Sequence, residues 1–336
     1  MKLRFGILGT GNIAKQFATG VTKSTLTTLT AVGSRTTASA DAFAKQFGIA
    51  NAHGSYDALL TDPAVDAIYL SLPNNMHHEW TIKALRAGKH VLCEKPLATS
   101  LAEAEEMFGA AERSGRVLVE AFMYRAHPQT IAAVKAIREG AIGKVRVIRT
   151  SFCYRTRKIE GNIRFDPTLA GGALMDIGCY CLDFSRLVAG AEPTGVSAES
   201  IIGPQGVDTL VSGSLKFSDD CVANFVCGMT AQADNAALVC GEEGWIRIPV
   251  PWKPLGHCGF TIERQTPPKQ DGGAATRPPL EKIDLMEERD VYGIEADAFA
   301  SVVLNNAAPF MSKQDSLGTI QLLDKVRTAM RDSPIR

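Results

Sequence analysis

The chain of 336 residues lacks a charge excess of either sign, because 36 Lys and Arg residues balance 36 Asp and Glu residues. It therefore lacks the basic field by which proteins hold nucleic acid. No apolar run approaches the roughly 18 residues of a membrane span, and no secretory leader precedes the first predicted strand. The eight cysteines form no C-x-x-C pair, which argues against zinc or dithiol chemistry. We expect a cytoplasmic protein without a metal, a nucleic-acid partner or a membrane contact.

What the chain does have, at its start, is a glycine-rich turn. Residues 3–14 read LRFGILGTGNIA, so an apolar run ends in glycines and a helical pattern follows. The spacing G-x-G-x-x-A is typical of a strand–turn–helix that holds a dinucleotide pyrophosphate at the helix N-terminus. A tight turn without a ligand selects similar residues. The cofactor-binding candidates in this segment are Gly9, Thr10, Gly11, Asn12 and Ile13.

An acidic residue is missing where NAD-binding proteins usually carry one. Residues 26–37, which include the second predicted strand, contain no Asp or Glu. The ribose 2′-hydroxyl of NAD normally meets an acid about 20 residues after the glycines. Ser34 and Arg35 are suited instead to a 2′-phosphate, although a solvated arginine after a strand is the alternative. We therefore expect NADP as the cofactor, with NAD less favoured.

The first 120 residues alternate between strand and helix patterns, which predicts a doubly wound parallel sheet of the Rossmann type and an α/β fold. The predicted strands lie near 3–9, 27–34, 67–72, 89–93 and 117–121, and the predicted helices near 12–23, 37–47, 75–87 and 101–114. We expect this dinucleotide-binding domain to span residues 1–122.

The remainder, residues 123–336, predicts an α+β domain with an open, mostly antiparallel sheet that binds substrate and forms the oligomer contact. Its predicted elements are helices near 127–139, 174–188, 290–305 and 313–330, a strand at 145–155, a hairpin over 211–229, and short strands at 236–240, 244–248, 259–264 and 281–285. The Pro- and Gly-rich residues 266–279 are expected to form a loop. We expect the helix near 313–330 to pack back on the first domain. An uncovered sheet face favours a homodimer.

Two segments of the first domain carry polar residues at strand ends, where open α/β sheets bind ligands. Glu94 and Lys95 follow the predicted strand at 89–93, and Lys95 in a surface turn is the alternative. Ser71, Leu72, Pro73, Asn74 and His77 follow the preceding strand. For these, the alternative is that Asn74 caps a helix and that His77 is an exposed neighbour of His78. We count both segments among the cofactor-binding candidates.

The third chemically suggestive segment, residues 171–183, reads GGALMDIGCYCLD. In an α-helix Asp176 and Tyr180 share one face, because they are four residues apart. Gly171 and Gly172 would let the chain approach a ligand closely. A lysine nearby would lower the pKa of a phenol by favouring the phenolate. A capping aspartate and a core tyrosine are the alternative.

The segments GTGNIA, SLPNNMHHE, CEKP and GGALMDIGCY, in this order and spacing, make the chain resemble the glucose–fructose oxidoreductase, inositol dehydrogenase and MocA-like (Gfo/Idh/MocA) family over essentially its whole length. The family's histidine position is occupied here by Tyr180. That change, with EAFMYRAHPQ and NIRFDPTLAGG, resembles the dimeric dihydrodiol dehydrogenases and the NADP-dependent, xylose-type aldose dehydrogenases.

The resemblance implies an oxidoreductase that moves hydride between NADP and a hydroxyl or carbonyl carbon of an aldose or cyclic polyol. It implies catalytic roles for Lys95, for Asp176 and for Tyr180 as the acid/base. Candidates to line the substrate pocket are Arg125, His127, Tyr154 and Arg164. The alternatives are an anhydro-keto-sugar reductase, a trans-dihydrodiol dehydrogenase, or a nucleotide-binding sugar or redox sensor that is not an enzyme.

Overall fold

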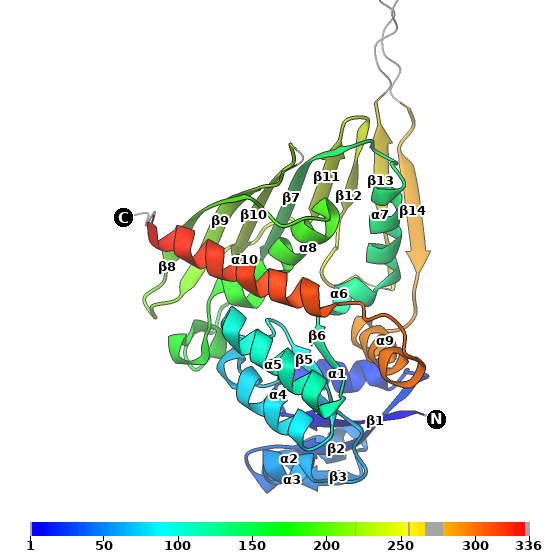
Figure 1. Ribbon diagram of the computed structural model, residues 1–336, viewed down its shortest axis with the longest axis vertical. Coiled ribbons are helices and arrows are strands. Elements are labelled where there is room, and N and C mark those ends of the chain that lie inside the picture. The colour runs from blue at the N-terminus through cyan, green and yellow to red at the C-terminus, as the bar shows by residue number, and fades with distance from the viewer. Residues whose placement is uncertain (1, 219, 255, 266–277, 333–336) are drawn as a thin grey trace, which may run out of the picture. The chain divides into compact units, whose positions relative to one another are not determined.

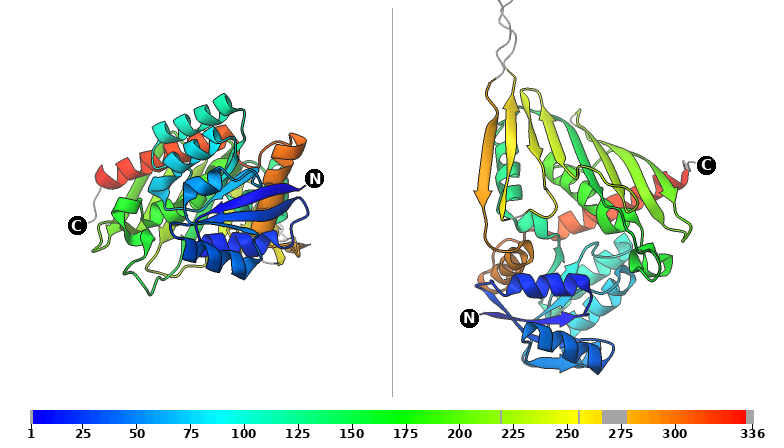
Figure 2. Two further views of the ribbon diagram at one scale, coloured as in Figure 1. Left: turned by 90° about the horizontal axis from the view of Figure 1, so that it is seen from below. Right: turned by 180° about the vertical axis from the view of Figure 1, so that it is seen from behind.

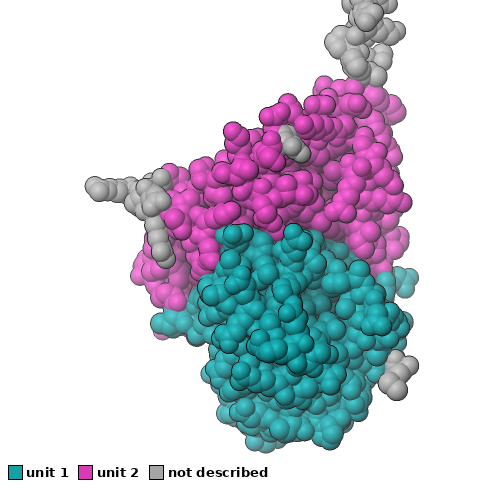
Figure 3. All heavy atoms as spheres, viewed as in Figure 1, with its two compact units in different colours: residues 1–126, 168–170, 288–321 teal, residues 127–167, 171–287, 322–336 magenta. Residues whose placement is uncertain are grey.

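The computed structural model describes residues 2–218, 220–254, 256–265 and 278–332. The chain divides into two compact units (Figure 3), of which the first comprises residues 1–126, 168–170 and 288–321 and the second residues 127–167, 171–287 and 322–336. The expected loop at 266–279 lies outside the described residues, except for its last two positions. No helix in the described part of the chain is long and apolar enough to cross a membrane.

The first unit is built on a six-stranded, entirely parallel sheet in the order β3-β2-β1-β4-β5-β6. The strands are β1 (Leu3–Leu8), β2 (Thr27–Gly33), β3 (Asn51–His53), β4 (Ala67–Leu70), β5 (His90–Glu94) and β6 (Leu118–Ala121). The strand order reverses between β1 and β4, which is the point where sheets of this kind bind ligands. The predicted doubly wound sheet is confirmed.

Helices accompany this sheet, and most of them lie where the periodicity predicts them. They are α1 (Asn12–Val21), α2 (Thr37–Phe47), α3 (Tyr56–Leu60), the 3-10 turn η1 (Asn74–Met76), α4 (His77–Arg86), α5 (Leu101–Ser114), α6 (Met123–Ala126) and α9 (Val291–Asn305). Neither β3 nor α3 was predicted from the sequence, because elements of three and five residues are too short to show a period.

Aromatic rings fill the core between the sheet and the helices α1 and α9. The ring of Phe17 stacks on Tyr69 at 3.6 Å between centroids, and Phe5 contacts both Phe17 and Phe299 at 5.5 and 5.6 Å. The helices α1 and α9 pack closely because both carry a glycine at the crossing. A Cβ at Gly20 would lie 2.8 Å from the backbone nitrogen of Gly293.

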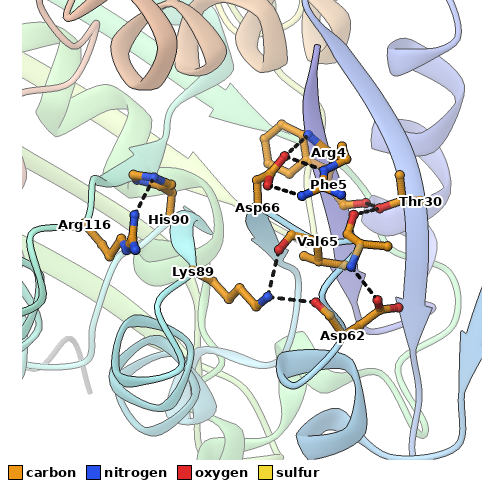
Figure 4. Close-up of polar contacts among 10 residues, drawn as sticks. Arg4, Phe5, Thr30, Asp62, Val65, Asp66, Lys89, His90 and Arg116 are labelled. Atoms are coloured by element: carbon orange, nitrogen blue, oxygen red, sulfur yellow. Dashed lines mark hydrogen bonds and ion pairs between the residues drawn. The ribbon is translucent and has the colours of Figure 1, made fainter. Parts of the chain in front are cut away.

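A polar cluster ties together the loops at the amino ends of the parallel strands (Figure 4). Arg4 forms an ion pair with Asp66 at 2.6 Å, and the ammonium group of Lys89 donates to the carbonyls of Asp62 and Val65 at 2.8 Å each. Burial lowers the pKa of Lys89. Because these contacts lie at the amino ends, they stabilise the sheet edge opposite the one where a ligand is expected.

The second unit contains an eight-stranded sheet in the order β14-β13-β12-β11-β7-β10-β9-β8, in which only β7 and β10 pair in parallel. The strands are β7 (Val145–Cys153), β8 (Gly195–Ile202), β9 (Asp208–Lys216), β10 (Val222–Gly228), β11 (Ala237–Gly241), β12 (Gly244–Ile248), β13 (His257–Arg264) and β14 (Glu281–Met286). The predicted open, mostly antiparallel sheet is confirmed, as is the hairpin, which is formed by β9 and β10.

Helices cover one face of this sheet. Both α7 (Pro128–Arg138) and α8 (Cys179–Ala189) lie against that face (Figure 1), and no described helix covers the other face in the view from behind (Figure 2). The remaining elements are the 3-10 turns η2 (Ile163–Phe165) and η3 (Pro167–Leu169), the π-helix η4 (Leu174–Gly178) and α10 (Lys313–Asp332), within which the boundary between the units falls.

Candidate active site

The glycine turn after β1 leaves open space at the start of α1. Gly9 has φ of +109°, a conformation that favours glycine, and its N–H donates to the carbonyl of Gly33 at 3.0 Å. Gly11 precedes α1 as its N-cap, and a Cβ built there would meet nothing within 4 Å. The first turn of α1 contains no acidic residue. A helix N-terminus that is neither capped by a side chain nor faced by its own acid suits an anionic pyrophosphate.

The end of β2 places Ser34 and Arg35 next to this turn. Ser34 is buried, and its hydroxyl lies 3.3 Å from that of Thr10. Its backbone N–H donates to the carbonyl of His53 at 3.0 Å, so the unpredicted strand β3 helps to hold it. Arg35 is exposed, and its charge partly offsets the burial that raises the pKa of Tyr56. A hydroxyl and a guanidinium in a stretch of sequence without an acid, residues 26–37, fit a phosphate.

The loop after β4 is anchored to the end of β1. The N–H and the hydroxyl of Ser71 both donate to the carbonyl of Leu8, at 3.1 Å each. Asn74 does not cap a helix as the alternative reading expected. Its side chain donates instead to the carbonyl of Ala170 at 2.9 Å.

His77 has no exposed surface, so the alternative of an exposed neighbour of His78 is wrong. Its Nδ1 lies 2.9 Å from the carbonyl oxygen of Pro96, and its Nε2 lies 2.9 Å from that of Leu72. Burial lowers the pKa of His77, while the carbonyls of Pro96 and Leu72 act in the opposite direction. The ring lies between the loops that follow β4 and β5.

The loop after β5 carries Lys95 between buried anchors. Glu94 is buried and accepts a hydrogen bond from the hydroxyl of Tyr69, and the peptide between Lys95 and Pro96 is cis. Burial, followed by the charge of Glu94, raises the pKa of Tyr69 well above its ordinary value, so its hydroxyl stays a donor. Lys95 itself is half-buried.

One buried acid near this loop was not singled out from the sequence. Glu295 of α9 has no exposed surface, and neither carboxyl oxygen has a hydrogen-bond partner among the described residues. Burial raises its pKa well above the ordinary value, and the charge of Glu94 raises it further. The only sequence signal was an acid within an otherwise apolar helix.

In the second unit, the segment that carries Asp176 is a π-helix rather than the expected α-helix. Because a π-helix has i→i+5 hydrogen bonds and is wider, Asp176 and Tyr180 are separated by less than one turn. Tyr180 is only 3% exposed, and its ring contacts Phe152 and Trp252 at 5.4 and 5.9 Å between centroids. The aromatic contacts fix the plane of the phenol.

Asp176 joins two of the residues expected to line the substrate pocket. Its Oδ2 accepts a hydrogen bond from the hydroxyl of Tyr154 at 2.5 Å and one from Nε of Arg164 at 2.9 Å. Burial and the Asp176 carboxylate raise the pKa of Tyr154, so this phenol stays protonated. The three residues were predicted separately from the sequence, and their joining in one network emerges from the structure.

The paired glycines before η4 accommodate protein groups. A Cβ at Gly171 would lie 2.5 Å from the carbonyl oxygen of Arg164, and one at Gly172 would lie 2.2 Å from Oδ1 of Asp208. Close contacts within the chain therefore account for both glycines, in place of the ligand that was expected beside them. Asp208, which the sequence analysis missed, accepts from the N–H of Leu174 at 2.7 Å and so caps η4.

The other two pocket candidates have structural contacts. Arg125 is buried and lies 3.5 Å from a carboxylate oxygen of Asp315. His127 is buried and is the N-cap of α7, where its Nδ1 accepts from the N–H of Gln129 at 3.1 Å. Among the described residues, no three His, Cys, Asp or Glu side chains are grouped as a metal site requires.

Two family profiles match the chain. One, described as an oxidoreductase family with an NAD-binding Rossmann fold, matches residues 3–122. The other, described as the C-terminal domain of the Gfo/Idh/MocA group, matches residues 130–247.

Similar proteins cover between three quarters and nearly all of the chain. A D-xylose 1-dehydrogenase (NADP(+)) of Haloferax volcanii is 32% identical over 324 residues, which are 96% of either chain. A trans-1,2-dihydrobenzene-1,2-diol dehydrogenase of Mus musculus is 35% identical over 257 residues, which cover 76% of this chain and 77% of that protein. A crystal structure of a 3-ketoreductase from Actinomadura kijaniata, in complex with NADP and TDP-benzene, has a TM-score of 0.87 and 33% identity, and covers 98% of both chains.

Proposed function

The chain belongs to the Gfo/Idh/MocA family of oxidoreductases, and on that premise we propose that it is an NADP-dependent dehydrogenase or reductase of an aldose or cyclic polyol. The observation that carries the proposal is the open glycine turn after β1, with Lys95 at the same carboxyl edge of the parallel sheet. The similarity to NADP-linked sugar enzymes supports it.

The cofactor site that we propose follows the carboxyl edge of the first unit. The turn Gly9–Ile13 would hold the pyrophosphate, because α1 offers free N–H groups there. Ser34 and Arg35 would hold the 2′-phosphate. Ser71 to Asn74, together with Glu94 and Lys95, would border the nicotinamide. Bound NADP would accept or supply the hydride.

The proton transfer is assigned to Tyr180. In the oxidative direction Tyr180 takes the proton of the substrate hydroxyl, and in the reductive direction it returns a proton to the carbonyl oxygen. The ammonium group of Lys95 favours the phenolate and stabilises negative charge on the substrate oxygen. Asp176, held by Tyr154 and Arg164, orients the substrate hydroxyl or Lys95.

Two other substrate classes are alternatives to an aldose or cyclic polyol, and both would use the same residues. A reductase of a keto sugar is favoured by the 3-ketoreductase similarity, and a trans-dihydrodiol dehydrogenase by the Mus musculus relative. A sensor that binds nucleotide and sugar without turnover is the third candidate. Lys95, Asp176 and Tyr180 are all present, which favours an enzyme.

The experiment is a substrate panel assayed with the purified chain. Aldoses including D-xylose, cyclic polyols and a trans-dihydrodiol are offered with NADP, and keto sugars with NADPH, while the absorbance of the reduced nicotinamide is followed. We expect NADP reduction with at least one aldose or polyol. Tight NADP binding without turnover of any compound would favour the sensor and contradict the proposal.

We also propose a homodimer that forms through the uncovered face of the second sheet. Along β7 and β11 this face includes Arg149, Ser151 and Leu238, whereas the alternate residues Ala237 and Val239 are buried on the helix side. An exposed sheet face is commonly covered by a second copy of the chain.

A further inference from the structure

His77 connects two loops of the first unit that are separated in the sequence. The imidazole lies at the start of α4, and its nitrogens lie 2.9 Å from the carbonyl oxygens of Leu72 and Pro96. Leu72 is five residues before the histidine, and Pro96 is 19 residues after it. The ring therefore bridges the loop after β4 to the loop after β5.

Both loops lead directly to residues of the proposed site. Leu72 follows Ser71, which is fixed to the end of β1 beside the glycine turn. Pro96 follows Lys95, so a contact to the carbonyl of Pro96 constrains the backbone one residue from the lysine. The His77 ring thus ties Lys95 to the glycine turn through two backbone contacts.

Further anchors restrain the lysine loop from the other side. The N–H of Leu97 donates to Oε1 of Glu120 in β6 at 2.8 Å, and Glu120 has no exposed surface. On the strand side, Glu94 accepts from Tyr69. Lys95 is consequently bracketed by buried contacts from β4, α4 and β6, and the His77 contact reaches the loop after β4.

The geometry leaves the imidazole unsuited to contact a cofactor. The side chain has no exposed surface, and each nitrogen faces a backbone carbonyl rather than a cavity. Its neighbour His78 differs in both respects, since it is 28% exposed and contacts Glu106 at 2.8 Å. The pair therefore offers a buried histidine and a matched control at adjacent positions.

We propose that His77 is a positioning residue, which acts on the reaction only through Lys95 by fixing the loop that carries it. The proposal rests on the proposed function of Lys95. The proposal opposes two alternatives. One is that His77 binds NADP directly, and the other is that His77 contributes to stability alone. A displacement of a reacting group by about 1 Å can lower the rate about a hundredfold.

The decisive experiment is a double-mutant cycle between His77→Phe and Lys95→Ala in the purified chain. His77→Phe keeps a planar ring but removes both nitrogens. We expect it to lower kcat about ten- to a hundredfold at saturating NADP and to leave the Kd of NADP within about threefold of the wild-type value. In the Lys95→Ala background the same substitution should change kcat by less than about threefold, because the group that it positions is gone.

Two controls keep the cycle interpretable. His78→Phe should leave kcat and Kd near the wild-type values. His77→Gln can still donate to one carbonyl and should restore part of the kcat that His77→Phe loses, which keeps the test valid if the phenylalanine variant folds poorly. The proposal would be overturned if His77→Phe lowered kcat equally in the wild-type and Lys95→Ala backgrounds. It would also be overturned if His77→Phe weakened NADP binding and left kcat unchanged.

A second readout does not depend on turnover. The rate at which an amine-acylating reagent modifies Lys95 is measured by peptide mass spectrometry, with exposed Lys135 as the reference in the same sample. We expect His77→Phe to bring the rate at Lys95 toward that at Lys135, and an unchanged rate would contradict the positioning role. If the wild-type chain turned over no sugar, the proposed function would fail, and this labelling comparison would still decide whether His77 fixes Lys95.

Discussion

At the scale of single residues, we propose that cofactor choice depends on Ser34 and Arg35, the two side chains that follow β2. Ser34 is buried beside Thr10, and exposed Arg35 adjoins it, with no acid nearby in the chain. A phosphate at this position would gain a charge-assisted hydrogen bond from Arg35, whereas the ribose hydroxyl of NAD would gain little. We therefore predict that the guanidinium group of Arg35 largely determines the preference for NADP over NAD.

Arg35→Asp tests this assignment. We expect it to weaken NADP binding about ten- to a hundredfold, because a hydrogen bond to a charged group contributes roughly 1.5–3 kcal/mol. The binding of NAD should change far less. Titration of the chain with NADPH and NADH, followed by fluorescence, measures both constants. Arg138→Asp, an exposed charge reversal on α7, serves as the control. An equal loss of affinity for both cofactors would show that Arg35 does not contact the 2′-phosphate.

At the scale of elements, the start of η4 depends on the carboxylate of Asp208. It accepts from the N–H of Leu174, with Gly172 packed against it. Burial raises the pKa of Asp208 to about 6, against the lowering effect of the backbone N–H donors and of Arg327. An unfolded aspartate titrates near 3.9. The folded chain therefore holds this proton more tightly than the unfolded chain.

The sign of the resulting pH dependence follows from linkage. Stability is favoured while Asp208 is protonated in both states, below about pH 4. It falls as the pH rises to about 6, by up to about 3 kcal/mol in total for a difference of this size. We expect Asp208→Asn to remove this loss, so that its melting temperature exceeds the wild-type value at pH 7 by more than at pH 4. Calorimetry at the two pH values measures the difference, with the exposed Asp284→Asn as control. An equal difference at both pH values would contradict the assignment.

Most elements were predictable because their sequence carries a period or a cap. Gly48 and Gly115 end α2 and α5 with positive φ, as helix-terminating glycines do. The short β3 and the edge strand β8 were missed, since three residues show no alternation and the buried positions of β8 are Ala198 and Ser200, which give little apolar signal. The π-turn at Asp176 could not be predicted, because α- and π-helices share their composition. The burial of His77 and of Glu295 depends on neighbours that are distant in sequence.

At the scale of the whole molecule, the uncovered face of the second sheet predicts a dimer. Leu238 lies on that face, paired with Arg149 of β7. Leu238→Lys would place a charge in the proposed contact, where desolvation opposes it. We expect the wild-type chain to have the mass of a dimer at micromolar concentration and the variant to have the mass of a monomer, by light scattering. Ile131→Lys, on the exposed side of α7, should remain a dimer. A monomeric wild-type chain would contradict the proposal.

The central claim is that this oxidoreductase moves its proton through Tyr180. Tyr180→Phe tests it most directly, because the ring keeps its contacts with Phe152 and Trp252 while the hydroxyl is lost. On a substrate that the panel identifies, we measure kcat across pH together with the Kd of NADP. The account predicts a kcat at least about a hundredfold lower, the low end for general acid–base catalysis, loss of the rise in rate toward alkaline pH, and an unchanged Kd. A near-normal kcat with the wild-type pH dependence, under conditions where chemistry is rate-limiting, would contradict it.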